Sequence, residues 1–362
     1  MEPIHEPTAM TNSGLWQITK NPAHCAITRN NFVYKSLSDF ALNFAVGCGH
    51  GCLFCYVPST SVNKLGPKLE SLGVNDPDSE WGNYVFLRTW DDEKFLASLS
   101  VAEQTPVDQL KPDGNRAVLL CSTTDAYQTI RHPDPKRQKE LQEHLRYIVR
   151  RSLELIRDHS TLNVRILTRS PLVRRDFDLL STLGNRVLLG MSIPTLRNDL
   201  SKIYEPKAPA PSVRLNTLQA AANIGIPVFA AIAPTYPECD ERDLRATVGA
   251  IAALRPVTIF HEPINIRAEN VTRIEEHARE LGVTLNTDVF KSPEAWQAYA
   301  LQSLHLVEQI ALEHGVADRL HLWPDKALGT QKALSRMSKP ERDLHHQWIT
   351  RWWSRISEWP GA

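Results

Sequence analysis

The sequence has no net charge, no long apolar run and no pattern of paired cysteines. Lys plus Arg and Asp plus Glu number 41 each among the 362 residues. The total charge therefore gives no sign of a polyanion-binding protein, although a local basic groove is compatible with a neutral total. No apolar stretch approaches the roughly 20 residues of a membrane helix, and the first residues lack the basic and apolar regions of a signal peptide. We therefore expect a cytoplasmic protein without a membrane span.

The six cysteines are not distributed like those of a disulfide scaffold. Cys48, Cys52 and Cys55 lie within eight residues, whereas the other three are scattered along the chain. Clustered thiols in a chain without a secretion signal are more often metal ligands than disulfide partners. The cluster around Cys48 is thus the first candidate site, and no second cluster of ligands is expected.

From residue 41 onward, short apolar runs alternate with amphipathic stretches. The runs that predict strands are 41–46, 117–121, 164–168, 187–193, 227–233 and 257–261. The stretches that predict helices are 139–158, 176–183, 213–223 and 241–254. This alternation predicts an α/β fold with a parallel sheet. Six strands indicate a partial (β/α)6 barrel of the TIM type rather than a closed barrel of eight strands.

The chain divides into three parts by composition. Residues 1–39 are expected to form a polar leader, 40–292 the core domain, and 293–362 a helical, Trp-rich extension. Residues 58–82 are rich in Pro, Gly, Ser and Asp and are predicted to be a long surface loop. In parallel barrels the chemistry takes place at the carboxyl ends of the strands, so the residues that follow each strand are the candidates for function.

The cysteine cluster has the spacing Cys-x3-Cys-x2-Cys and directly follows a predicted strand. Glycines at 47, 49 and 51 give this loop the conformational freedom to bring three sulfurs together. Three thiolates on a four-iron cluster leave one iron open, and a chelating amino acid such as the methionyl end of S-adenosylmethionine (SAM) can bind there. The alternative is zinc, with His50 or Cys25 as the fourth ligand, although no second Cys-x2-Cys half is present.

The loop from Gly47 to Tyr56 resembles the signature of the radical SAM superfamily, and more narrowly its spore photoproduct lyase-like (DNA-repair photolyase-like) branch. The resemblance covers roughly 40–265 and continues, in order, through segments 122–128, 167–176, 192–195, 205–209 and 232–234. It implies a 4Fe–4S cluster on Cys48, Cys52 and Cys55 that cleaves SAM reductively. The 5′-deoxyadenosyl radical so formed abstracts hydrogen from a substrate, with electrons from a partner such as flavodoxin or ferredoxin.

The resemblance also implies contacts with SAM. Phe54 would lie beside the adenine, and Arg169, at a position where relatives usually have Lys, would hold the carboxylate with a changed geometry. Ser192 would meet the ribose. The amino group and ribose would also be contacted by Ser122, Thr123, Thr124 and Asp125. The alternatives are an ordinary strand-end hydroxyl for Ser192 and a surface charge for Arg169.

Cys121 ends a predicted strand, where substrate should approach. In the spore photoproduct lyase-like branch a Cys at this strand end donates a hydrogen atom to the product radical, although here the following segment is one residue longer. Alternatively, Cys121 is a small buried thiol that fills the core. Tyr56 and Tyr127 are candidate radical relays or packing residues.

The pair His261–Glu262 follows the last predicted strand and is a candidate base or substrate anchor, or a structural pair. Because no concentrated basic patch is present, we expect the substrate to be a small molecule or a peptide. The first alternative is repair of thymine lesions in DNA, and the second is a non-catalytic iron–sulfur or zinc-binding module.

Overall fold

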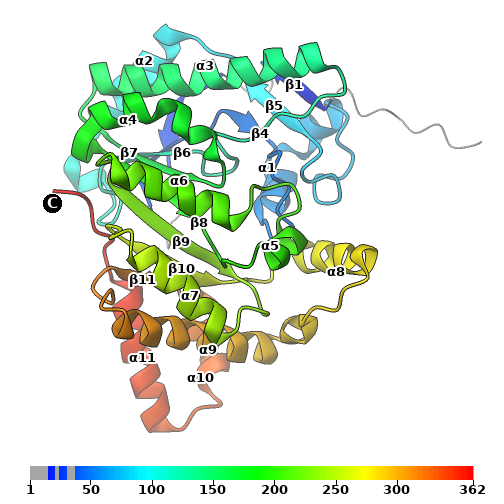
Figure 1. The fold of residues 1–362 in the computed structure, drawn as a ribbon, viewed down its shortest axis with the longest axis vertical. Helices are drawn as coiled ribbons and strands as arrows, with labels where there is room; N and C mark the ends of the chain where they lie inside the picture. Colours follow the sequence, from blue (N-terminus) through cyan, green and yellow to red (C-terminus); the bar gives the residue numbers. More distant parts are fainter. Residues whose placement is uncertain (1–14, 21–23, 31–36, 362) are drawn as a thin grey trace, which may run out of the picture.

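The computed structural model describes residues 15–20, 24–30 and 37–361. Its main element is an eight-stranded sheet of order β11-β10-β9-β8-β7-β6-β3-β2 (Figure 1). All neighbouring strands are parallel except β2, which is antiparallel to β3. The strands are β2 Ile27–Arg29, β3 Phe40–Leu42, β6 Ala117–Leu120, β7 Asn163–Thr168, β8 Val187–Ser192, β9 Val228–Thr235, β10 Ile259–Pro263 and β11 Leu320–Leu322.

Helices cover the outer face of this sheet, with α6 against β8 and β9 and α9 against β10 and β11 (Figure 1). The longest helix, α3, begins after the capping residue Asp134 and buries Leu141, Leu145 and Ile148, one face of the helix. The helices are α1 Val57–Ser71, α2 Asp92–Glu103, α3 Pro135–His159, α4 Phe177–Leu183, α5 Asn198–Tyr204, α6 Pro211–Asn223, α7 Glu241–Ala252, α8 Asn270–Leu281, α9 Pro293–Glu313, α10 Gln331–Leu334 and α11 Lys339–Trp353.

The sheet is an open, partial barrel, as the sequence predicts. Within the described residues its edge strands β2 and β11 do not pair with each other. The six predicted strands correspond to β3 and β6–β10, and the four predicted helices correspond to α3, α4, α6 and α7. The α/β fold class and the partial barrel are therefore confirmed.

One predicted strand is divided between two sheets. The run 41–46 forms β3 in the main sheet and β4 (Ala45–Val46) in a three-stranded sheet of order β1-β5-β4, with β1 at Trp16–Thr19 and β5 at Val85–Arg88. Asn43 lies at the break. Its side-chain oxygen accepts hydrogen bonds from the backbone N–H and the hydroxyl of Thr123, both at 3.1 Å. These bonds fix the point at which the chain leaves the main sheet.

The predicted surface loop over 58–82 is wrong in its first half, because residues up to 71 form α1. Proline in the first turn of a helix loses no hydrogen bond, and Pro58 occupies such a position in α1. The carboxyl-terminal extension likewise contains a strand, β11, which was not predicted because three residues are too short to show a pattern. Much of the expected leader (1–14, 21–23 and 31–36) lies outside the described residues, and the domain boundaries stay a prediction.

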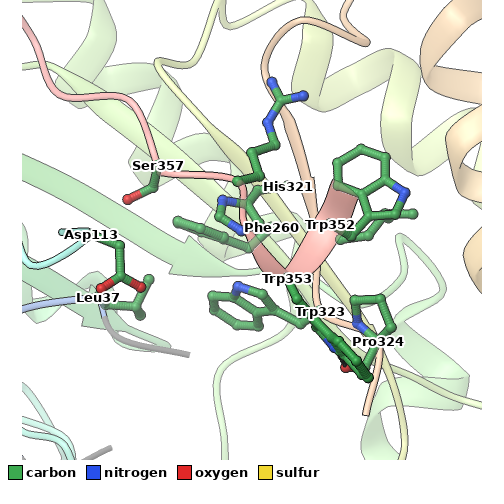
Figure 2. A pocket seen from close by; sticks show the side chains of 11 residues that line it. Leu37, Asp113, Phe260, His321, Trp323, Pro324, Trp352, Trp353 and Ser357 are labelled. Atoms are coloured by element: carbon green, nitrogen blue, oxygen red, sulfur yellow. Dashed lines mark hydrogen bonds between the residues drawn. The ribbon is translucent and has the colours of Figure 1, made fainter. Parts of the chain in front are cut away.

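The barrel interior is packed with side chains. Phe229 and Phe260 fill it together with Arg165, whose guanidinium lies 5.6 and 5.8 Å from their ring centres and 5.1 Å from that of Trp359. Arg165 is fully buried, and none of its three side-chain nitrogens has a hydrogen-bond partner in the described part of the chain. A cavity of about 20 Å³ beside this interior is lined by Asp113, His321 and several tryptophans (Figure 2). None of its lining residues is a predicted site residue.

Candidate functional site

The cysteine loop follows β4 and lies at the carboxyl edge of the sheet. Gly47 has φ +86° and is so close to Tyr84 that an added Cβ would lie 2.2 Å from the Tyr84 carbonyl oxygen. At Gly49 an added Cβ would lie 2.7 Å from the carbonyl oxygen of Thr129. Only glycine fits at these two positions, so the glycines also let the loop pack closely. Cys48 and Cys52 are buried.

The segment after β6 holds this loop in place. The Thr124 hydroxyl donates to the carbonyl of Gly47 (2.6 Å), and the side-chain oxygen of Gln128 accepts from the N–H of Gly49 (2.6 Å). These bonds attach the second barrel strand to the cysteine loop. The structure thus brings together two segments that the sequence analysis assigned separately to the cluster and to SAM.

Asp125 is the centre of the same attachment. Its carboxylate is 3.1 Å from His50 Nε2, and it accepts from the Thr168 hydroxyl (2.7 Å) and from the N–H groups of Arg169 (2.9 Å) and Tyr127 (2.8 Å). Burial alone would raise the pKa of Asp125, but His50 and the backbone donors lower it to about 2. This carboxylate therefore stays ionised and connects the cysteine loop to the end of β7.

Glu205, which the sequence analysis did not single out, links Arg169 to the cysteine loop. Its fully buried carboxylate accepts from Arg169 Nε (2.6 Å) and from Arg214, and it lies 3.9 Å from the Cys52 sulfur. Burial alone would raise the pKa of Glu205, but the two guanidinium groups lower it to about 2. One sequence signal could have pointed to Glu205. It begins the Glu-Pro-Lys segment, which is one of the ordered segments that carry the family resemblance.

Arg169 points toward the loop and not toward bulk solvent, with a side chain that is 20% exposed. Its guanidinium carbon lies 5.4 Å from the centre of the Phe54 ring. Burial alone would lower the pKa of Arg169, but the neighbouring Cys52 sulfur and Glu205 carboxylate raise it. Nη1 and Nη2 have no hydrogen-bond partner among the described residues. These two donors are available to a carboxylate. The ion pair with the fully buried Glu205 contradicts the alternative of an ordinary surface charge.

Helix α8 closes the loop from the other side. Arg273 donates to the carbonyls of Leu53 (3.1 Å) and Cys55 (2.5 Å), and Asn270 donates to the carbonyl of Phe54 (3.2 Å). These residues lie more than two hundred positions from the loop in the sequence. No local pattern pointed to them.

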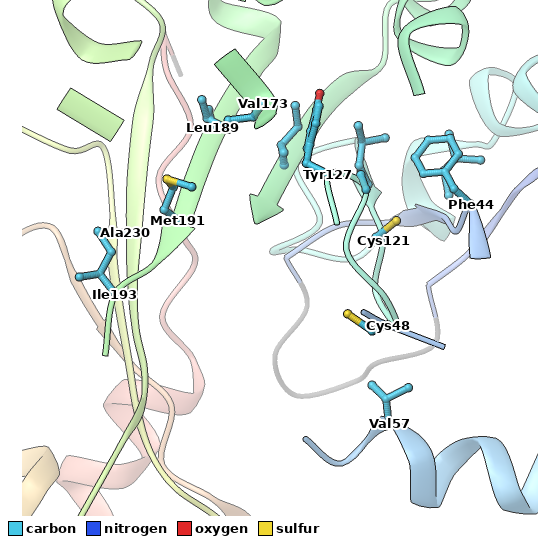
Figure 3. Close-up of a cluster of buried hydrophobic side chains, with 14 of the residues drawn as sticks. Phe44, Cys48, Val57, Cys121, Tyr127, Val173, Leu189, Met191, Ile193 and Ala230 are labelled. Carbon is cyan, nitrogen blue, oxygen red and sulfur yellow. The ribbon is translucent and has the colours of Figure 1, made fainter. Parts of the chain in front are cut away.

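Cys121 is buried and adopts the left-handed conformation, with φ +66°. Figure 3 labels it with Cys48 in one buried cluster, and the two thiols are close enough to influence each other electrostatically. The hydroxyl of Tyr127 points away from both sulfurs in that view. The geometry thus brings Cys121, but not the Tyr127 hydroxyl, to the cysteine loop.

Four further candidate residues have surroundings that do not decide their roles. Tyr56 is 40% exposed at the start of α1. The Ser192 hydroxyl donates to the carbonyl of Ala233 (2.7 Å), and those of Ser122 and Thr123 bond to the side chain of Asn43. The roles expected for Tyr56, Ser122, Thr123 and Ser192 therefore stay predictions.

His261 is separated from the candidate site. It is fully buried on the outer side of the sheet, 3.0 Å from the carbonyl of Ile232 and 3.4 Å from the Ser303 hydroxyl of α9. Burial lowers its pKa to about 4. Its neighbour Glu262 bonds instead to Asn265 (2.9 Å). The two side chains therefore do not act as a pair, and His261 is a neutral packing residue.

Three thiols on one loop beside a guanidinium are the donor chemistry that a four-iron cluster and SAM require. In the described part of the chain no group of three or more His, Cys, Asp or Glu side chains is close enough together to hold a single metal ion. A four-iron cluster instead binds each thiolate to a different iron. Burial, followed by Asp125, raises the pKa of Cys48 to about 12, so cluster binding must displace a thiol proton. The free Nη donors of Arg169 fit the SAM carboxylate.

Known proteins place this chain in a family. The model of the radical SAM superfamily matches residues 42–251. Uncharacterized protein ORF301 of Acidianus two-tailed virus is 30% identical over 263 residues, which cover 70% of this chain and 77% of that protein. Uncharacterized protein MJ0683 of Methanocaldococcus jannaschii is 23% identical over 273 residues, 75% of this chain and 86% of that one.

Among solved structures, spore photoproduct lyase has a similar fold. One structure of a variant with dinucleoside spore photoproduct has a TM-score of 0.59 at 14% identity and covers 90% of this chain and 87% of that one. Another, complexed with dinucleoside spore photoproduct, has a TM-score of 0.56 at 15% identity and covers 82% and 80%. At this identity the similarity shows the fold alone.

The fold and the family match define an enzyme that works through a radical and a metal cluster: the chain belongs to the radical SAM superfamily. Its cofactors are therefore a 4Fe–4S cluster and SAM, and it requires a reductant and a substrate. The alternative of a non-catalytic module is not supported. No helix in the described residues is long and apolar enough to cross a membrane.

Proposed function

We propose that Cys48, Cys52 and Cys55 bind the cluster and that Phe54 and Arg169 bind SAM at its open iron. The observation that supports this proposal is the packed cysteine loop at the carboxyl edge of the barrel, next to an Arg169 guanidinium with two free donors. When bound and reduced, the cluster supplies the electron that cleaves SAM to methionine and a 5′-deoxyadenosyl radical.

The protein contributes position and charge. Glu205 holds Arg169 through Nε, so the other end of the guanidinium is oriented before SAM arrives. Thr124 and Asp125 fix the loop that carries the thiolates. We retain Ser122, Thr123, Thr124 and Asp125 as contacts to the SAM amino group and ribose, and Ser192 as a ribose contact. Binding then requires that SAM replace some of their present hydrogen bonds.

A small molecule or a peptide remains the proposed substrate, because the charge is balanced. Repair of a thymine lesion in DNA is the second candidate, and one observation favours it. Cys121 lies next to the cysteine loop, where it could return a hydrogen atom to a product radical, with Tyr56 as a relay. The proposed reductant is a flavodoxin or ferredoxin, and the proposed location is the cytoplasm, where reducing conditions preserve the cluster.

Anaerobic reconstitution tests the proposal. The chain should bind close to four irons and show a reducible paramagnetic cluster. Replacing Cys48, Cys52 or Cys55 by Ala should abolish it. Cys239→Ala is the matched control, because this thiol is also buried but lies against the Pro194 carbonyl, at 4.0 Å, and not in the cysteine loop. This variant should keep the iron content of the wild type. Stoichiometric zinc, without cluster formation on addition of iron and sulfide, would contradict the assignment.

The reconstituted enzyme should form 5′-deoxyadenosine when reduced with SAM present. Affinity for DNA at several salt concentrations then separates the two substrate classes. A protein that neutralises phosphates loses affinity steeply as salt rises. Absence of any DNA binding would leave the small-molecule or peptide class.

A further inference from the structure

Tyr236 follows β9 at the carboxyl edge of the sheet and was not singled out by the sequence. Its side chain is fully buried, and its ring stacks on that of Tyr204 at 4.0 Å with an interplanar angle of 5°. The Tyr236 hydroxyl has no hydrogen-bond partner among the described residues. Buried polar groups in native proteins are nearly always paired, so this hydroxyl requires an acceptor that the described part of the chain does not provide.

The stacked partner, Tyr204, does have a hydrogen-bond acceptor for its hydroxyl. The Tyr204 hydroxyl, equally buried, donates to Glu238 at 2.7 Å. The same environment thus supplies an acceptor to one tyrosine and none to the other. Chain packing alone does not account for the Tyr236 hydroxyl.

The groups around Tyr236 are those of the cofactor site. Its ring centre lies 5.9 Å from that of Phe54, within the cysteine loop. The guanidinium of Arg169 faces the same Phe54 ring at 5.4 Å. After burial, the Glu205 carboxylate has the largest electrostatic influence on the Tyr236 phenol, followed by Arg214, Arg169 and Cys52. Burial raises its pKa well above the ordinary value, so it is a neutral donor at physiological pH.

We propose that Tyr236 is a SAM-binding residue whose hydroxyl donates a hydrogen bond to an acceptor of bound SAM. This inference rests on the proposed function of the site. The acceptor is an oxygen or nitrogen of SAM, either in its methionyl carboxylate or in its nucleoside. Tyr236 thereby extends the set of cofactor contacts from the third barrel strand, at Arg169, to the fifth.

Tyr236→Phe tests this with two readouts that should move in opposite directions. In the reconstituted protein the affinity for SAM should fall at least fivefold, because one hydrogen bond is lost. In the protein without cluster and SAM, the melting temperature should stay the same or rise, because the variant removes an unsatisfied buried hydroxyl. Tyr204→Phe is the matched control. It should lower the melting temperature, because it breaks the bond to Glu238, and leave SAM affinity unchanged.

The affinities of Tyr236→Phe for 5′-deoxyadenosine and for methionine are then measured separately. A loss of 5′-deoxyadenosine affinity places the acceptor in the nucleoside, and a loss of methionine affinity places it at the amino-acid end. Wild-type SAM affinity in Tyr236→Phe would overturn the inference. So would a loss of melting temperature in the cofactor-free variant as large as that of Tyr204→Phe, since it would reveal a partner within the chain. A wild-type protein that binds neither cluster nor SAM is a different result and overturns the proposed function itself.

Discussion

Replacing Glu205 by Gln removes one negative charge from between two guanidinium groups in the protein interior. The side chains of Glu205 and Arg214 are 0% exposed and that of Arg169 is 20% exposed. The variant keeps the size of the side chain and one acceptor oxygen, but it leaves two buried cations facing a neutral amide. Truncating one partner of a buried ion pair typically costs about 3–5 kcal/mol.

The pKa of Glu205 gives a second value for the stability that its charge contributes. Its pKa falls from the ordinary value of 4.5 to about 2 in the folded protein. At about 1.4 kcal/mol for each pKa unit, the ionised form stabilises the fold by roughly 3 kcal/mol. Because the folded pKa is the lower one, this contribution is present above pH 4.5 and is lost as the pH falls from about 4.5 through about 2.

Urea unfolding of the cofactor-free protein measures both effects. At pH 7 the free energy of unfolding of Glu205→Gln should be about 3 kcal/mol below that of the wild type, a large part of the 5–15 kcal/mol typical of a domain. The gap should narrow as the pH approaches 2. A difference below about 1 kcal/mol at pH 7, or one that does not depend on pH, would refute the reasoning.

Glu294→Gln provides the control for this experiment. Its pKa is also lowered to about 2, by Arg336 first, but its side chain is 41% exposed. Water and salt screen such a pair. The urea midpoint of this variant should therefore stay close to that of the wild type.

Three further substitutions test separate parts of the structure. Arg169→Ala should assemble the cluster but bind SAM at least tenfold more weakly, because a charge-assisted contact contributes about 1.5–3 kcal/mol; unchanged affinity by titration would remove Arg169 from the SAM site. Cys121→Ala should still cleave SAM but give altered products if its thiol donates hydrogen. A normal product with about 1 kcal/mol of lost stability would instead make it a packing residue. Arg165→Met should raise the free energy of unfolding by about 1 kcal/mol, because it removes a buried cation that has no hydrogen-bond partner among the described residues. A loss of similar size in urea unfolding would show that the three surrounding rings stabilise the cation.

Periodicity and motif spacing predict much of the fold and the centre of the site. Strand–helix alternation is a local property, so β6–β10 and the helices α3, α4, α6 and α7 followed from the sequence, whereas the seven-residue α5 did not. The spacing of Cys48, Cys52 and Cys55 likewise indicates a cluster, because all three ligands belong to one short loop. The sequence did not predict short or interrupted elements correctly. The strand expected at 41–46 is divided at Asn43, whose side chain bonds to Thr123. Strand β11 has too few residues to show a period.

The sequence by itself determined the fold class and the family resemblance, and it predicted the proposed cysteine ligands, because these depend on residue order over short distances. Only the tertiary structure decided which distant side chains converge on the loop. Glu205 on Arg169, Arg273 on the loop carbonyls, and Tyr236 beside Phe54 are contacts between residues of different strands and helices. The structure also shows that the His261 side chain lies on the outer face of the sheet, against α9. Alternate residues of a strand point to opposite faces, and only the folded sheet shows which face meets the site.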